Sequence, residues 1–199
     1  MAIWNSRFKK SFDKSALKFS SSIDIDGKLF NEDIDGSKAH VKMLMKQKIV
    51  STSDGNSILK ALEEIRNEIS NGKLKFDWQK EDIHSLIEER LVEKIGERGK
   101  RLHTARSRND QIALDERLYL RNEIKNLLKL ISDFQKVLQK CLDALPEQWN
   151  MCVKLKYLTE KSGEEICQEL NIAPTNYWQI VHRAKLQLRN CVENNWFKN

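Results

Sequence analysis

The chain has 199 residues, of which 40% are hydrophobic and 32% are charged, and its formal net charge is +6. This balance supports a folded core, and 7 glycines and 2 prolines are too few for a turn-rich β protein. The sequence has no apolar run of about 18 residues and no apolar signal core at its start, so we expect a cytoplasmic protein that does not engage a membrane. The composition predicts an all-α fold in one or two domains.

Helical periodicity begins after a polar stretch of 36 residues that is interrupted by Gly27 and Gly36. Apolar residues at helical spacing predict three helices, over 37–50, 56–70 and 83–95. Ser53-Asp54-Gly55 is expected to form the turn or N-cap that opens the second helix, and Asn71-Gly72 to end it.

The segment 103–111 is rich in cations, hydroxyls and amides and stands directly before the longest helical pattern. Its polar side chains are Thr104, Arg106, Ser107, Arg108 and Asn109. Guanidinium forks and exposed backbone N–H groups at a helix N-terminus suit a ligand that carries carboxylates. Ser107, Asn109 or Asp110 would also serve as the helix cap, and capping is compatible with binding.

A helix of roughly 54 Å is predicted from Asp110 to Leu145, where Pro146 follows. Its apolar residues recur with a seven-residue period: Leu120, Ile124, Leu127, Ile131, Phe134, Leu138, Cys141 and Leu145. Such a stripe needs partner helices, from this chain or from others, so we expect a homo-oligomer formed through 110–145.

Shorter helices are predicted beyond Pro146, over 147–158, 163–170 and 175–196. A tight connection at Asn171–Pro174 gives the last two a helix-turn-helix outline, and the boundary is placed at about 138–146. Arg183, Lys185 and Arg189 lie in a stretch without acids, which fits either an anion-binding face or an ordinary solvated face.

All four cysteines, Cys141, Cys152, Cys167 and Cys191, lie in the last third of the chain. Their spacing includes no C-x-x-C, so a zinc site is disfavoured and no metal is expected. We expect reduced, buried cysteines that act as small hydrophobic residues.

The run His103-Thr104-Ala105-Arg106-Ser107-Arg108-Asn109-Asp110-Gln111 resembles the signature of argininosuccinate lyases, in the fumarase/aspartase superfamily. Supporting segments occur in order over about residues 3–138: Trp4–Phe8, Ser21–Ile23, Asp33–His40 and Glu81–His84. The resemblance implies elimination of fumarate from argininosuccinate in arginine biosynthesis, no cofactor, and an active site assembled from several subunits. It further implies substrate-binding positions at Ser22 and Asn109, with Thr104, Arg106, Ser107 and Arg108 around them, and structural roles for His84 and His103.

The resemblance stops before the proton-transfer groups. An elimination beside a carboxylate needs a base for the carbon-bound proton and an acid for the leaving nitrogen. The family takes these from a later Thr-His segment and a Gly-Ser-Ser loop, and neither pattern occurs here. We therefore expect a truncated lyase with no catalytic residue of its own, able to bind argininosuccinate or fumarate at a partial site but inactive alone.

Residues of about 139–199 resemble region four of bacterial sigma factors of the extracytoplasmic-function type. The matching features are Leu145-Pro146, Glu164-Glu165-Ile166 and Arg183-Ala184-Lys185 followed by Leu188-Arg189. The resemblance implies contact with promoter DNA and RNA polymerase, although sigma region two is missing. In the major groove the last helix would present Thr175, Asn176 and Gln179 to bases, and Arg183, Lys185 and Arg189 to phosphates. Its inward face is expected to hold Tyr177, Ile180, Val181, Ala184 and Leu188, with Trp178 at the edge.

The expected domains are a lyase-like part over 1–109, a long bundle helix over 110–145 and a helix-turn-helix part over 146–199. Three hypotheses follow from this composite. The chain is a lyase-family polypeptide that needs other chains, a DNA-binding module whose lyase-like part only oligomerises, or a non-functional fragment that aggregates through its exposed stripe.

Overall fold

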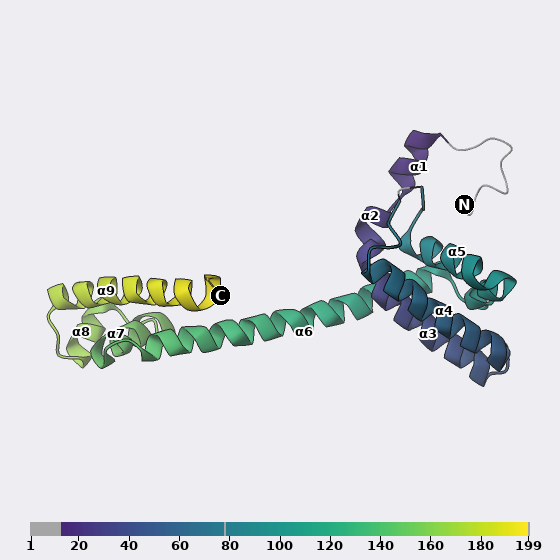
Figure 1. Cartoon of the computed structure of the whole chain (residues 1–199). Coiled ribbons are helices and arrows are strands. Elements are labelled where there is room, and N and C mark those ends of the chain that lie inside the picture. The colour runs from purple at the N-terminus through teal and green to yellow at the C-terminus, as the bar shows by residue number, and fades with distance from the viewer. Residues whose placement is uncertain (1–12, 78, 199) are drawn as a thin grey trace. The chain divides into compact units, whose positions relative to one another are not determined.

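A computed structural model describes residues 13–77 and 79–198, so the Trp4–Phe8 segment lies outside the described residues (Figure 1). The described chain is helical and contains no strand, which confirms the all-α prediction. Its elements are α1 (Lys14–Ser20), α2 (Ile23–Asp26), the 3-10 turn η1 (Gly27–Leu29), α3 (Phe30–Lys46), α4 (Thr52–Ser70), α5 (Ile83–Ile95), the 3-10 segment η2 (Gly96–His103), α6 (Arg108–Asp143), α7 (Glu147–Leu158), α8 (Gly163–Glu169), α9 (Pro174–Val192) and the π-helical turn η3 (Glu193–Phe197). No described helix is both long and apolar enough to span a bilayer.

The described chain divides into two compact units, one ending at Glu123 and one beginning at Ile124. In the first unit, α3, α4 and α5 pack around one apolar core. Its fully buried side chains include Ile34, Ile58, Leu62, Ile65, Ile83, Ile87 and Leu91. The division falls within α6, and the domain ranges expected from the sequence remain a prediction.

The predicted bounds of α5, residues 83–95, are confirmed. Asp82 caps it by accepting a hydrogen bond from the Ser85 backbone N–H at 2.6 Å. The end of α4 before Asn71 is also confirmed, but its predicted start is wrong. Ser51 is the cap, because its hydroxyl accepts from the Asp54 N–H at 3.1 Å, so the expected Ser-Asp-Gly turn forms the first helical turn.

Helix α3 differs most from the prediction, since it begins at Phe30 rather than 37 and ends at Lys46 rather than 50. Gly36 lies inside it and interrupts nothing. A Cβ atom there would approach Leu114 Cδ2 of α6 to 3.0 Å, so the glycine allows the two helices to pack closely. Buried polar residues in the first turns, Glu32 and Asp33, hid this helix from a count of apolar residues.

The second unit is built from α7, α8 and α9 and the end of α6. Its core contains Cys152, Ile166, Tyr177, Ile180 and Val181, and a neighbouring cluster contains Leu145, Val153 and Ala184. Ser162 and Glu165 form a capping box at the start of α8. The predicted inward face of α9 is confirmed, with Leu188 partly buried against the second cluster.

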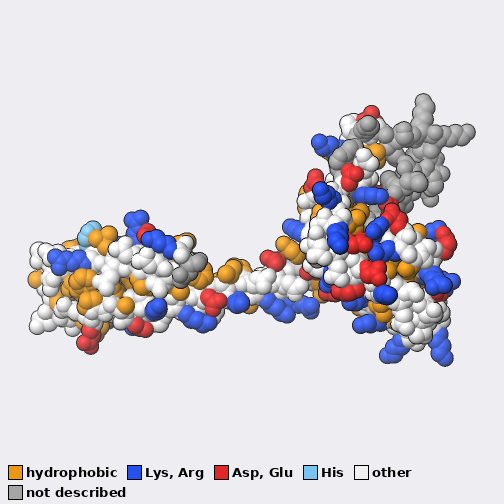
Figure 2. Space-filling view, in the orientation of Figure 1, with side chains coloured by type: hydrophobic (Ala, Val, Ile, Leu, Met, Phe, Trp, Pro, Cys, Tyr) orange, Lys and Arg blue, Asp and Glu red, His pale blue; other side chains and the backbone are white. Residues whose placement is uncertain are grey.

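Helix α6 extends from Arg108 to Asp143, so each end lies two residues before the end predicted by the range 110–145. Much of its apolar surface is uncovered in the described structure, and apolar side chains lie along it in Figure 2. The exposed fractions are 57% for Leu120, 55% for Ile124, 56% for Leu127, 61% for Leu128, 55% for Leu130 and 46% for Ile131. At its C-terminal end the stripe is covered, because Cys141 and Leu145 are buried in the second unit.

Two cysteines depart from the expectation of reduced thiols, because Cys141 and Cys191 form a disulfide. Their Cα atoms are 5.8 Å apart although 50 positions separate them in sequence. The pairing follows from packing of the end of α9 beside α6, which no local spacing encodes (Figure 1). The other two behave as expected, since Cys152 is buried, Cys167 is partly buried, and both are free thiols.

Candidate functional site

The carboxylate-binding candidates of segment 103–111 lie at the junction of η2 and α6. The Thr104 carbonyl accepts a hydrogen bond from His40 Nε2 at 2.9 Å, which fixes the turn against α3. The exposed Ser107 hydroxyl accepts from the Asn109 N–H at 3.3 Å, so Ser107 is the capping residue among the three candidates. The Asn109 side chain is exposed.

The two guanidiniums point to different neighbours. Arg106 donates through Nη1 to the Ser37 hydroxyl of α3 at 2.8 Å. Arg108 donates through Nη1 to Glu88 at 3.0 Å and to Gln111 Oε1 at 2.7 Å. Within the described residues, Nε and Nη2 of Arg108 are buried and have no hydrogen-bond partner. Arg108 therefore keeps N–H groups for a carboxylate, whereas Arg106 is engaged with α3.

Ser22 lies at the start of α2, against the N-terminal end of α5. Its hydroxyl donates to the Asp26 carboxylate at 2.5 Å, and Asp26 accepts from the Ile83 N–H at 3.1 Å. Asp82, the cap of α5, lies 3.9 Å from Arg108 Nε. The fold thus brings Ser22 and Arg108 to the same end of α5, while it directs Arg106 toward α3.

A buried polar cluster beneath the motif was missed from the sequence. His84 Nδ1 lies 3.1 Å from an Asp33 oxygen and 3.5 Å from an Asp115 oxygen, and Gln111 donates to the same Asp33 oxygen. All four side chains are buried. One signal was available, because Gln111 and Asp115 are four residues apart and so share a face of α6.

The charges in this cluster are set by burial and by close neighbours. Burial, reinforced by the nearby Asp33 carboxylate, raises the pKa of Asp115 to about 7. Burial also acts to raise the pKa of Asp33, but the hydrogen bond and charge of His84 outweigh it and hold that pKa below its usual value. For His84, burial opposes protonation, yet the hydrogen bond to Asp33 prevails and raises its pKa.

The donor atoms of Asp33, His84 and Asp115 lie within 4.8 Å of one another, a spacing that suits a metal ion. The positive charge of Arg106 acts on both carboxylates, and His84 pairs with Asp33. The cluster already contains its counter-charges, so we assign it no metal.

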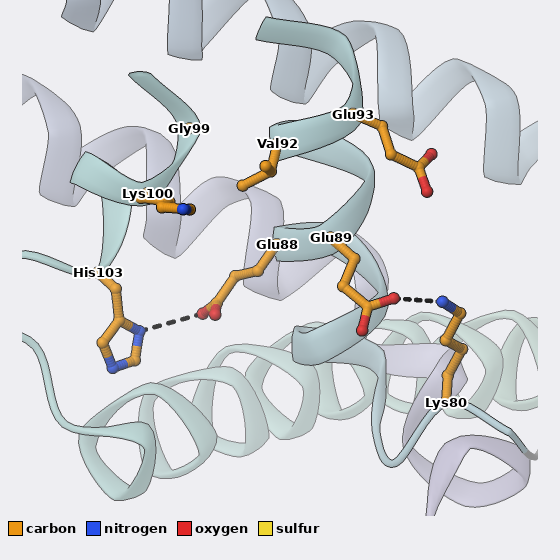
Figure 3. A pocket seen from close by; sticks show the side chains of 8 residues that line it. All are labelled: Lys80, Glu88, Glu89, Val92, Glu93, Gly99, Lys100 and His103. Carbon is orange, nitrogen blue, oxygen red and sulfur yellow. Dashed lines mark hydrogen bonds and ion pairs between the residues drawn. The ribbon is translucent and has the colours of Figure 1, made fainter. Parts of the chain in front are cut away.

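A surface pocket of about 770 Å³ lies over α5 and η2 (Figure 3). It is lined by Lys80, Glu88, Glu89, Val92, Glu93, Gly99, Lys100 and His103. His103 Nδ1 lies 3.1 Å from Glu88, the carboxylate that also accepts from Arg108. None of the six substrate-binding candidates lines this pocket. It adjoins the candidate site through Glu88, the partner of Arg108, and through His103, the first residue of segment 103–111.

The DNA-binding candidates are all exposed on α9. Thr175, Gln179 and Arg183 follow at four-residue intervals and therefore share one face, with Asn176 beside them. Arg189 is ion-paired with Glu193 at 2.9 Å. Lys185 lies on another side of the helix, where its Nζ atom is 5.6 Å from the centre of the Tyr157 ring.

Trp178 is 63% exposed and lies on the same flank as Lys185. Its ring packs edge-on against Tyr177 with centroids 5.4 Å apart, and Lys156 Nζ lies 4.9 Å above it. This contact with α7 places the bulky ring beside the Thr175–Gln179–Arg183 face rather than on it.

Comparison with known proteins matches the N-terminal and C-terminal parts of the chain to two different families. The family described as Lyase matches residues 6–144, and the family described as Sigma-70, region 4 matches residues 135–188. Argininosuccinate lyase of Moorella thermoacetica is 50% identical over 138 residues, which cover 69% of this chain and 30% of that protein. Argininosuccinate lyases of Legionella pneumophila (strain Paris) and Clostridium kluyveri (strain ATCC 8527) are 49% and 46% identical over 71% and 72% of this chain, and 34% and 33% of theirs.

The chain thus spans about a third of the length of the curated relatives it matches. The two family matches overlap at residues 135–144, near the end of α6. An argininosuccinate lyase-like N-terminal region is fused to a sigma-70 region 4 domain. Because the Lyase family matches residues 6–144, more than half of its length, the chain belongs to the lyase family.

Proposed function

We propose that the N-terminal region is an argininosuccinate lyase-like polypeptide that binds a dicarboxylate, argininosuccinate or fumarate, at a partial site and is inactive alone. Three relatives are named argininosuccinate lyases, and their similarity covers the segment that carries the candidate residues. Two buried N–H groups of Arg108 that have no hydrogen-bond partner would supply a carboxylate anchor, and Ser22 lies at the same end of α5.

In this reaction a base removes a proton from the carbon next to a carboxylate, the C–N bond breaks, and an acid protonates the leaving nitrogen. Arg108, Ser22 and Asn109 would hold the substrate, while other polypeptides would supply the acid and base. The observation that carries this proposal is the uncovered apolar face of α6, which offers a surface on which such polypeptides would assemble.

Complementation tests this proposal. The purified chain is mixed with a Moorella thermoacetica lyase inactivated by substitution in the segment equivalent to 103–111, and fumarate release is followed by absorbance. We expect release from the mixture and from neither component alone. Arg108→Ala should abolish the effect, whereas Lys136→Ala, an exposed control on α6, should preserve it. No release under any mixing ratio would contradict the proposal.

A second function is favoured by the outward face of α9. We propose that the C-terminal unit binds promoter-like duplex DNA, with Thr175, Asn176 and Gln179 toward bases and Arg183 toward phosphate. Arg189 and Lys185 are assigned phosphate contacts too, although Arg189 would first have to leave Glu193. In this alternative the lyase-like part serves only oligomerisation through 110–145, RNA polymerase is the partner, and both functions place the chain in the cytoplasm.

Fluorescence anisotropy with promoter duplexes at several salt concentrations tests the second function. Replacing Arg183 and Arg189 together by Ala should weaken binding about tenfold and flatten the salt dependence. Arg183→Ala alone should account for most of the loss, because Arg189 is already paired with Glu193. Lys136→Ala removes one charge elsewhere and serves as the control. Equal binding by the double variant and the unchanged chain would refute this function.

A further inference from the structure

We propose that Cys141 and Cys191 are a reversible redox site, formed and opened by thiol–disulfide exchange with a low-molecular-weight disulfide such as glutathione disulfide. The inference rests on the proposed cytoplasmic location and does not depend on lyase activity or on DNA binding. Disulfides in cytoplasmic proteins of mesophiles are usually transient or redox-sensing, because cellular thiols keep most cysteines reduced.

The pair lies where two helices end. Cys141 is three residues from the start of the α6–α7 connection and is 1% exposed, whereas Cys191 is one residue from the end of α9 and is only partly buried. The bond therefore joins the end of α6 to the end of α9, across 50 positions of sequence. The unit also contains Cys152 and Cys167 as free thiols, which provide internal controls in the same domain.

The bond fixes the turn η3 and the last turn of α9 on α6. Trp196 of η3 packs edge-on against Phe134 with ring centroids 5.1 Å apart, and Lys140 Nζ donates to Asn195 at 3.0 Å. These are a ring contact and an exposed hydrogen bond, each of which contributes little by itself. Opening the disulfide removes the covalent link between this segment and α6, while the noncovalent contacts remain.

The core of the helix-turn-helix does not depend on the bond. Ile166, Tyr177, Ile180 and Val181 are buried against Cys152 at the other end of α9. Leu188 packs against the cluster of Leu145, Val153 and Ala184, which is also independent of the bond. Reduction should therefore loosen the region from about 189 onward while residues 163–188 keep their packing. Arg189 lies in the loosened part, and its ion-pair partner Glu193 is the first residue of η3.

The different exposure of the two cysteines indicates which one reacts first in the thiol–disulfide exchange. The Cys191 thiolate is the accessible nucleophile, so it attacks one sulfur of glutathione disulfide, releases one glutathione thiolate and forms a mixed disulfide. The Cys141 thiolate then attacks the Cys191 sulfur and releases the second glutathione. Two protein thiols are oxidised and one glutathione disulfide is reduced to two glutathiones, whose thiolates take up the two protons that the protein thiols lose. Reduction runs the same steps backwards.

The full chain is equilibrated with reduced and oxidised glutathione at several ratios, quenched by alkylation and digested for mass spectrometry. We expect a Cys141–Cys191 cross-linked peptide whose yield follows the ratio reversibly, while Cys152 and Cys167 remain alkylated. Hydrogen exchange of 189–198 should be at least about tenfold slower in the oxidised form, with 163–188 unchanged. A cross-link that does not respond to the ratio, or equal exchange in both forms, would overturn the proposal.

Single substitutions distinguish the cysteine that attacks glutathione disulfide, Cys191, from the cysteine that then attacks the mixed disulfide, Cys141. Cys141→Ala should accumulate a glutathione adduct on Cys191, because the second attack is lost. Cys191→Ser should accumulate no adduct on Cys141, since that side chain is buried. Cys167→Ser should respond as the unchanged chain does. A glutathione adduct on Cys141 and none on Cys191 would overturn the assigned order. These adducts are measured by mass spectrometry and so test the redox site even if the chain binds no DNA.

Discussion

Asp115 is a carboxyl group without contact to solvent, 3.5 Å from His84 Nδ1 and within 4.8 Å of the ionised Asp33. Burial and the neighbouring negative charge raise its pKa from 3.8 to about 7. An acid whose pKa is higher in the folded chain binds its proton more tightly there than in the unfolded chain, so its contribution to stability is lost as pH rises through the folded value. His84, whose pKa is raised, contributes in the same direction, whereas Asp33 acts oppositely at low pH.

We therefore predict that the first unit loses about 2 kcal/mol of stability between pH 5 and pH 8. Asp115→Asn should remove most of this dependence, because the amide does not ionise. Hydrogen exchange of α5 and the start of α6 measures the opening of this unit by itself. Asp110→Asn, at an exposed position of the same helix, is the matched control and should retain the slope. A slope unaltered by Asp115→Asn would contradict the assigned protonation.

The candidate site was only partly predictable from its residues. The composition of 103–111 identified guanidiniums and hydroxyls but not their direction, which depends on where Ser37, Glu88 and Gln111 lie. Asp33 and Asp115 were missed because apolar periodicity assigns acids to the surface, whereas paired acids are also found in cores. On α9 the exposure of Thr175, Gln179 and Arg183 could be expected from the sequence, because one helix alone determines which residues share a face; their contact with DNA stays a prediction.

At the scale of elements, periodicity gave α5 and α6 within two residues because strong stripes and clear caps coincide there. It failed for the start of α3, where the helix buries polar side chains and Gly36 serves packing against α6. It could not give the Cys141–Cys191 bond, which depends on how the ends of two helices pack.

Helix α6 also makes a prediction about assembly. Exposing Ile124, Leu127, Leu128 and Ile131 to water is unfavourable by about 1–2 kcal/mol for each side chain that a partner would bury. Changing Leu127 and Ile131 to Gln should therefore weaken self-association without lowering the stability of either unit's core, because neither side chain lies in a core. Sedimentation of the variant against a Lys136→Ala control checks this. Unchanged association would exclude this face as the interface.

In the whole molecule, the matches to the two families overlap at the end of one helix, α6. The lyase match ends at residue 144 and the sigma region 4 match begins at residue 135, both within or just beyond α6. Both matches are helical at this point, so the backbone continues without a break. Each unit has its own apolar core, and α6, within which the two units meet, carries an apolar face that is exposed among the described residues.

We expect other copies of the chain to cover the apolar face of α6. Size-exclusion chromatography with light scattering on the full chain, at several concentrations, measures this directly. We expect a discrete mass of two or more chains, which falls toward one chain when Leu127 and Ile131 are both changed to Gln. A single-chain mass at every concentration, with α6 still protected from hydrogen exchange, would contradict it.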